Sequence, residues 1–179
     1  AEAVHALLGQ PLAVKQSVSV DLPLAAHLPA SYVADPAQRL NLYQRLADAA
    51  TAEEVGTLGA ELCDRFGPPP QPALNLLYVV ELKVLAQQAG VEAISRRDGA
   101  IVLVVSTALP AEVLRAACAP AGQAATVRPG VLRLDQARLR DWQPVLYEVV
   151  RRLGDGRKGG AEARVSSAST SRVATRKRA

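Results

Sequence analysis

The chain has 179 residues, of which 49% are hydrophobic, and its formal net charge is +4. This length suits one domain with its own core, together with appendages. No apolar run approaches the roughly 18 residues that a membrane span needs, and no signal peptide is visible. The only two cysteines, Cys63 and Cys118, are far apart in sequence. These features favour a cytoplasmic protein without a disulfide framework and without a membrane partner.

The positive charge is concentrated near the end of the chain. Residues 154–179 contain seven basic and two acidic side chains, a charge of +5, which leaves −1 for all the residues before them. Gly, Ser, Thr, Ala and Arg dominate this stretch, and such a composition cannot bury enough apolar surface to offset its ordering entropy. We therefore expect residues 154–179 to form a disordered basic tail.

The first third of the chain predicts a strand, an extended arm and a helix. Residues 1–11 begin without Met and resemble the last turns of a helix, so we expect them to be the trailing helix of an upstream module. Residues 12–20 alternate apolar and polar side chains, as a half-buried strand does. A proline-punctuated arm follows over residues 22–34. Asp35 as N-cap and Pro36 as first residue then favour a helix over about 36–49, with its apolar positions at Leu40, Tyr43, Leu46 and Ala47.

Two more helices are marked by strong capping signals. Thr51 and Glu54 have the spacing of a capping box, and Gly67 before three prolines ends the second helix. The apolar stripe of that helix consists of Val55, Leu58, Leu62 and Phe66. The third helix, about 72–89, is apolar over most of its circumference, which is typical of a helix buried between two layers. Glu81 is the exception to this apolar character.

The second half predicts a hairpin, a short helix, a strand pair and a final helix. The hairpin joins residues 91–97 to 100–106 through Asp98 and Gly99. The unbroken apolar run over residues 101–105 predicts a strand covered on both faces. A helix over about 110–119, strands within 125–134 and a helix over about 139–153 complete the pattern, with Trp142, Leu146, Val149, Val150 and Leu153 as packing residues. The fold class is therefore α+β, a single domain over residues 12–153 with helices packed on a small antiparallel sheet.

Catalytic and metal-binding chemistry has little support. The only histidines, His5 and His27, have no serine, cysteine or carboxylate at a recognisable spacing. The separated cysteines and histidines form no paired metal-ligand motif. Residues 154–160 are glycine-rich, but they lack the Lys-Ser/Thr ending of a phosphate-binding loop. We predict no catalytic residue, no metal site and no cofactor in this chain.

The second helix carries the best candidate for a binding site. At helical spacing, Glu61 and Asp64 occupy neighbouring positions opposite the apolar stripe. Two carboxylates on one ridge are suited to charge-assisted bonds with arginines of another surface. The alternative is an ordinary solvated helix face.

Several motifs of this region resemble the C-terminal domain of the bacterial transcription-repair coupling factors. The matching residues are Leu22-Pro23, Leu28-Pro29, Tyr32-Val33, Asp35, Arg39-Leu40, Tyr43, Arg45-Leu46, Glu61-Leu62 and Asp64-Arg65-Phe66-Gly67. The resemblance implies a parent protein that uses ATP and Mg²⁺, in modules upstream of this chain, to move on duplex DNA. Such a parent displaces stalled RNA polymerase and recruits the damage-recognition ATPase of excision repair. Glu81 departs from the family pattern, which favours Arg at this position.

The resemblance also implies a role for the acidic ridge. Glu61 and Asp64 would dock on arginines of the N-terminal repair-recruitment module of the same protein and keep that module masked. Arg39 and Arg45 match the motif too, and Arg39 either pairs with Asp35 or contacts a partner. An alternative function is an accessory nucleic-acid-binding domain, in which the basic tail neutralises phosphates without reading sequence.

Overall fold

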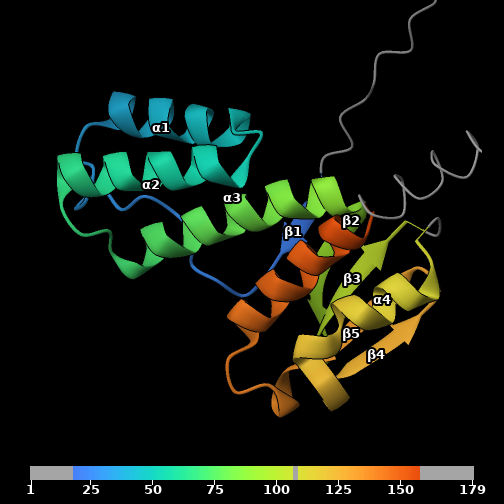
Figure 1. The fold of residues 1–179 in the computed structure, drawn as a ribbon. Helices are drawn as coiled ribbons and strands as arrows, with labels where there is room; N and C mark the ends of the chain where they lie inside the picture. The colour runs from blue at the N-terminus through green and yellow to red at the C-terminus, as the bar shows by residue number, and fades with distance from the viewer. Residues whose placement is uncertain (1–17, 107–108, 158–179) are drawn as a thin grey trace, which may run out of the picture.

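The computed structural model describes residues 18–106 and 109–157, and it confirms the α+β class (Figure 1). The helices are α1 (Pro36–Asp48), α2 (Ala52–Phe66), α3 (Gln71–Ala89) and α4 (Ala111–Ala117), followed by a final helix over residues 142–157. The strands are β1 (Ser19–Asp21), β2 (Val91–Arg97), β3 (Ala100–Val105), β4 (Ala125–Arg128) and β5 (Val131–Asp135). Two 3₁₀ helices, η1 (Ala119–Ala124) and η2 (Gln136–Arg138), flank the β4–β5 pair.

The five strands form one sheet in the order β1-β2-β3-β5-β4. The pairs among β2, β3, β5 and β4 are antiparallel, as predicted, but β1 pairs with β2 in parallel, with Ser19 opposite Ala93. The sheet is therefore mixed. A parallel neighbour is possible here because α1, α2 and α3 form a long crossover between the two strands, whereas a tight turn can only join antiparallel strands. Such a turn links β2 to β3, where Asp98 and Gly99 both have positive φ, 49° and 71°.

Helices cover one face of this sheet and form the main core with it. Inward side chains of the strands, among them Ile94, Leu103 and Leu132, meet α3, α4 and the final helix. The predicted packing residues Leu146, Val149, Val150 and Leu153 are all 0% exposed. α3 lies between the sheet and the α1–α2 layer (Figure 1), which explains why it is apolar nearly all round.

The α1–α2 layer packs on α3 through two smaller clusters. Leu42 and Leu62 lie in one, and Leu46, Val55 and Leu58 lie in the other. The stripe predicted for α1 is mostly wrong. Of its four positions only Leu46 is buried, whereas Leu40 is 60% exposed, Tyr43 is 36% exposed and Ala47 is exposed. α1 is the outermost helix of the domain and contacts the rest on one narrow side only, so Leu42 and Leu46 alone are buried in it.

The final helix runs further than predicted. Residues 154–157, assigned above to the disordered tail, are helical. Gly156 serves close packing there, because a Cβ at this position would lie 2.6 Å from Cγ1 of Val113 in α4. Arg157 donates from Nη1 to the carbonyl oxygen of Gln88 at 3.3 Å. The rest of the predicted tail, the predicted helix over 1–11 and residues 12–17 of the predicted strand lie outside the described residues.

The second face of the sheet differs from the prediction for β3. Ile101 and Leu103 point into the core and are 0% exposed, but Val104 on the opposite face is 37% exposed and Val102 is only half-buried. No described residue covers this face as the helices cover the other. Within the described residues, no helix is long and apolar enough to cross a membrane.

Candidate interdomain docking surface

The extended arm before α1 fixes the end of α2 that carries the acidic ridge. Tyr32 Oη lies 3.0 Å from the carbonyl oxygen of Leu62 and 2.8 Å from that of Gly67. The Tyr32 ring packs edge-on against Phe66 with a centroid distance of 5.8 Å. Burial, and secondarily the neighbouring Cys63, raises the pKa of the Tyr32 hydroxyl, so it remains a donor at neutral pH. The last turn of α2 is therefore held in place.

Hydrogen bonds fix the arm at other points as well. The Leu28 backbone N–H donates to Tyr43 Oη at 2.8 Å, and Asn75 Nδ2 donates to the carbonyl oxygen of Ala25 at 3.0 Å. Tyr43 of α1 and Asn75 of α3 thus hold the backbone of the arm on the surface of the helical layer.

Arginines of the same domain already bind Glu61 on α2. Arg45 donates through both terminal nitrogens to the two carboxylate oxygens, at 2.8 and 2.6 Å. Arg65, one turn along α2, donates to Oε1 at 2.9 Å. The hydrogen bond from Arg45, and then that from Arg65, lowers the pKa of Glu61 to about 2. The Glu61 side chain keeps 29% of its surface exposed, so a third cation can still approach it.

Asp64 differs from Glu61 in having no such partner. It is exposed on the next turn of α2, and among the described residues none forms a hydrogen bond or ion pair with its carboxylate. The structure thus places the two predicted carboxylates side by side on α2. Asp64 lies opposite the buried Val55, Leu58 and Leu62, whereas Glu61 lies at the flank that faces α1. Of the two, only Asp64 presents an unpaired charge.

The two arginines of the predicted interface have contacts within the domain. Arg45 joins α1 to α2 through Glu61, as described above. Arg39 donates from Nη1 to the carbonyl oxygens of Val33 and Ala34, at 2.6 and 2.9 Å. It does not pair with Asp35, whose carboxylate instead accepts from the Ala37 N–H at 3.0 Å as the N-cap. Arg39 therefore fixes the arm to α1 through backbone carbonyls.

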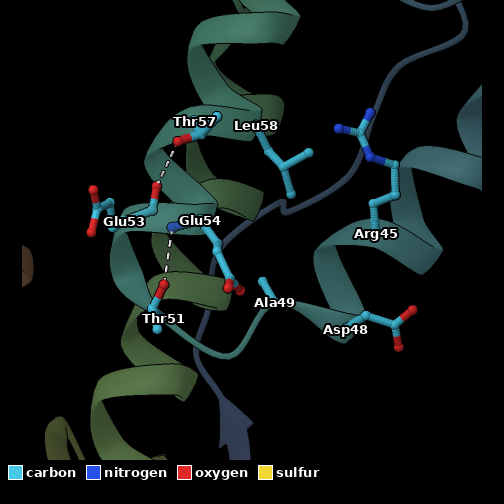
Figure 2. Close-up of a pocket in the computed structure, with 8 residues that line it drawn as sticks. All are labelled: Arg45, Asp48, Ala49, Thr51, Glu53, Glu54, Thr57 and Leu58. Atoms are coloured by element: carbon cyan, nitrogen blue, oxygen red, sulfur yellow. Dashed lines mark hydrogen bonds between the residues drawn. The ribbon is translucent and has the colours of Figure 1, made fainter.

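A shallow pocket of about 680 Å³ lies beside the ridge, at the elbow between α1 and α2 (Figure 2). Arg45 and Asp48 line it from α1, and Glu53, Thr57 and Leu58 from α2. The Thr51 hydroxyl accepts from the Glu54 N–H at 3.2 Å, and Glu54 Oε2 accepts from the Ala50 N–H at 2.7 Å, which gives the predicted capping box with a one-residue shift. The carboxylates of Asp48 and Glu53 have no such bond among the described residues, so the elbow extends the negative surface of the ridge.

The charge balance of this layer favours a cationic partner. Residues 36–67 contain five carboxylates and three arginines, a net charge of −2. Two of the three arginines are engaged by Glu61. The free carboxylates of Asp48, Glu53 and Asp64 remain for a partner of opposite charge.

Among the described residues, the histidine and the cysteines do not gather into a second site. His27 is exposed in the arm, and His5 lies outside the described residues. Cys63 is exposed, whereas Cys118 is buried and its burial raises the pKa of its thiol to about 11. No group of three potential metal ligands occurs within the described part of the chain.

Sequence reasoning missed the arginine contacts of Glu61 and the elbow pocket. The Glu61–Arg65 pair has i,i+4 spacing and could have been found from the sequence. The Arg45 contact could not, because it depends on how α1 and α2 lie side by side. Nothing in the pattern distinguished Leu40 as exposed.

The fold and this surface together define a small α+β domain whose clearest surface feature is the group of carboxylates on α2 and at the α1–α2 elbow. Comparison with known proteins gives its family. The model of the TRCF domain family matches residues 22–114, and the chain belongs to this family. The match includes the arm, α1, α2, α3 and the β2–β3 hairpin.

Curated relatives are transcription-repair-coupling factors that are much longer than this chain. It is 38% identical to the Mycobacterium tuberculosis protein over 95 residues, and these residues make up 53% of this chain and 8% of that protein. It is 34% identical over 113 residues to the Bacillus subtilis protein, covering 63% of this chain and 10% of that one. The Myxococcus xanthus protein is 41% identical over 83 residues, which cover 46% of this chain and 7% of that protein. The chain thus spans about a tenth or less of the length of these relatives.

A solved structure confirms the fold. The crystal structure of the C-terminal domain of a transcription-repair coupling factor matches with a TM-score of 0.67 over 78% of this chain and 91% of that chain. Only 20% of the residues are identical, so this match supports the fold alone.

Proposed function

We propose that this chain is the regulatory domain of an ATP-dependent DNA translocase that couples transcription to nucleotide excision repair. In this proposal it masks the repair-recruitment module near the N-terminus of the same protein by docking on it. Release of the domain, when the parent engages RNA polymerase on duplex DNA, exposes the surface that recruits the damage-recognition ATPase. The chain itself makes and breaks no bonds, and ATP and Mg²⁺ act elsewhere in the parent. The relatives' name and the shared family support this assignment.

The observation that carries the docking proposal is the unpaired carboxylate of Asp64 beside Glu61 on one exposed ridge. An arginine of the partner binds Asp64 directly, and a second one shares the exposed edge of the Glu61 carboxylate. Charge-assisted contacts of this kind give roughly a 100-fold preference for the docked state. That preference keeps the open form near 1%.

The internal arginines make Glu61 a weaker acceptor than Asp64. Arg45 and Arg65 already neutralise it, so a partner arginine gains less there. Replacing Arg45 frees two hydrogen-bond sites on the carboxylate. Docking through Glu61 therefore predicts tighter binding for Arg45→Ala, and docking through Asp64 alone predicts no change.

Isothermal titration calorimetry between the 179-residue chain and the isolated N-terminal module tests the proposal. Asp64→Arg reverses the charge at the unpaired position of the ridge, and we expect it to weaken binding about tenfold or more. Glu112→Arg on α4 is the matched control, because it makes the same charge change on an exposed helix position outside the α1–α2 layer. Equal affinity for the wild-type chain and Asp64→Arg would exclude this ridge as the docking surface.

A further inference from the structure

The uncovered face of the sheet is a second surface, separate from the α1–α2 layer. Its centre is apolar, with Val102 and Val104 of β3 beside Val131 of β5. An antiparallel sheet with one solvated face normally places polar side chains on that side. β3 instead reads as an unbroken apolar run, which is the pattern of a strand covered on both faces. The composition of this face therefore indicates that something covers it.

Two arginines lie beside the apolar centre, on the side of β4. Arg133 lies directly between Val102 and Thr126 in the register, and Arg128 is the next outward residue of β4 after Thr126. Residues diagonal to one another on neighbouring strands have Cβ atoms about 7–8 Å apart, within the reach of long side chains. Both guanidinium groups can therefore meet at one anionic group. With Val102, Thr126 and Val131, they line a hollow of about 450 Å³.

No carboxylate of the described residues neutralises these arginines. Neither Arg128 nor Arg133 forms an ion pair within the described ranges, and Arg133 has only a long bond, 3.4 Å, to the carbonyl oxygen of Asp98. Asp135, on the same strand, is engaged by Arg138 at 3.4 Å and caps η2 through the Ala137 N–H. The face thus combines an apolar centre with unpaired positive charge.

We propose that this face binds a segment of another protein that carries acidic and small apolar side chains. Carboxylates of the segment meet Arg128 and Arg133, and its apolar side chains cover Val102, Val104 and Val131. Single-stranded nucleic acid fits less well, because no aromatic side chain lies on these strands to stack a base. The basic residues of 158–179 have the wrong sign of charge to occupy the face.

An NMR titration of the isotope-labelled 179-residue chain tests this proposal. The probe is an octapeptide of alternating Glu and Val, and its counterpart alternates Lys and Val. We expect the Glu-Val peptide to shift amide signals of β3, β4 and β5, and the Lys-Val peptide to leave them unchanged. Arg133→Glu should weaken binding of the Glu-Val peptide about tenfold. Arg115→Glu on α4, the matched control, should leave it unchanged.

Each other outcome overturns the proposal. Equal binding of both peptides, shifts elsewhere, or no binding would show that the face does not select acidic segments. Binding that appears only after deletion of residues 1–17 would assign the face to the chain's own N-terminal segment. Shifts of the same signals on raising the protein concentration would assign it to a second copy, and shifts by a 20-base-pair DNA duplex without the peptide effect would assign it to nucleic acid. Asp64→Arg should not alter the titration, so this test is independent of the docking proposal.

Discussion

Tyr32 gives the sharpest test of how the arm stabilises the acidic helix. Its hydroxyl lies within hydrogen-bond distance of two carbonyl oxygens at the end of α2, and its ring packs on Phe66. Tyr32→Phe removes the hydroxyl and keeps the ring, so it should lower the free energy of unfolding by about 1 kcal/mol, the net contribution of one such hydrogen bond. Tyr32→Ala also removes the half-buried ring and should cost about 3 kcal/mol, at the low end for an aromatic residue.

Urea unfolding of the 179-residue chain measures both values. Far-UV circular dichroism reports the helices, and fluorescence of Trp142, the only tryptophan, reports the final helix. Tyr43→Phe is the matched control, because its hydroxyl accepts a single bond, from the Leu28 N–H, at a residue that is 36% exposed. We expect it to cost about as much as Tyr32→Phe, about 1 kcal/mol, because it leaves the N–H of Leu28, a residue only 4% exposed, without its partner. The hydroxyl and the ring would not contribute to stability as assigned here in either of two cases. Tyr32→Phe could be as stable as the wild type, or it could lose as much stability as Tyr32→Ala.

Three further predictions concern single positions. Because the folded-state pKa of Glu61 lies near 2, below its usual 4.5, its arginine contacts should stabilise the fold above pH 4.5 and lose this effect as the pH falls towards 2. NMR of the Glu61 carboxyl carbon should follow that titration. Arg45→Ala should move the midpoint of the Glu61 titration to higher pH, and an unmoved midpoint would show that Arg45 is not the cause of the lowered pKa. Gly156→Ala should destabilise the fold by up to about 2 kcal/mol in thermal unfolding, since the clash with Val113, at about 1–3 kcal/mol, is offset by a gain of about 1 kcal/mol in helix propensity. Leu40→Ser should change stability by less than about 0.5 kcal/mol in the same assay, because Leu40 is 60% exposed, and a larger loss would show that α1 buries it.

The sequence determined the local structure, because local signals act over a few residues. The Asp35 N-cap, the Thr51–Glu54 box, the stop at Gly67 and the Asp98-Gly99 turn depend on backbone donors and φ angles within one or two turns of the chain. For the same reason the ridge of Glu61 and Asp64 followed from helical spacing alone. The family resemblance also depended on these short motifs.

Tertiary structure alone decided which of those side chains remain available. Arg45 reaches Glu61 only because α1 and α2 pack side by side, and this leaves Asp64 as the unpaired carboxylate of the ridge. The parallel pairing of β1, the extension of the final helix by Gly156 against Val113, and the open face of β3 likewise depend on contacts between segments far apart in the chain. Periodicity shows that a residue is apolar or charged, but the neighbours that cover or neutralise it are placed by long-range packing.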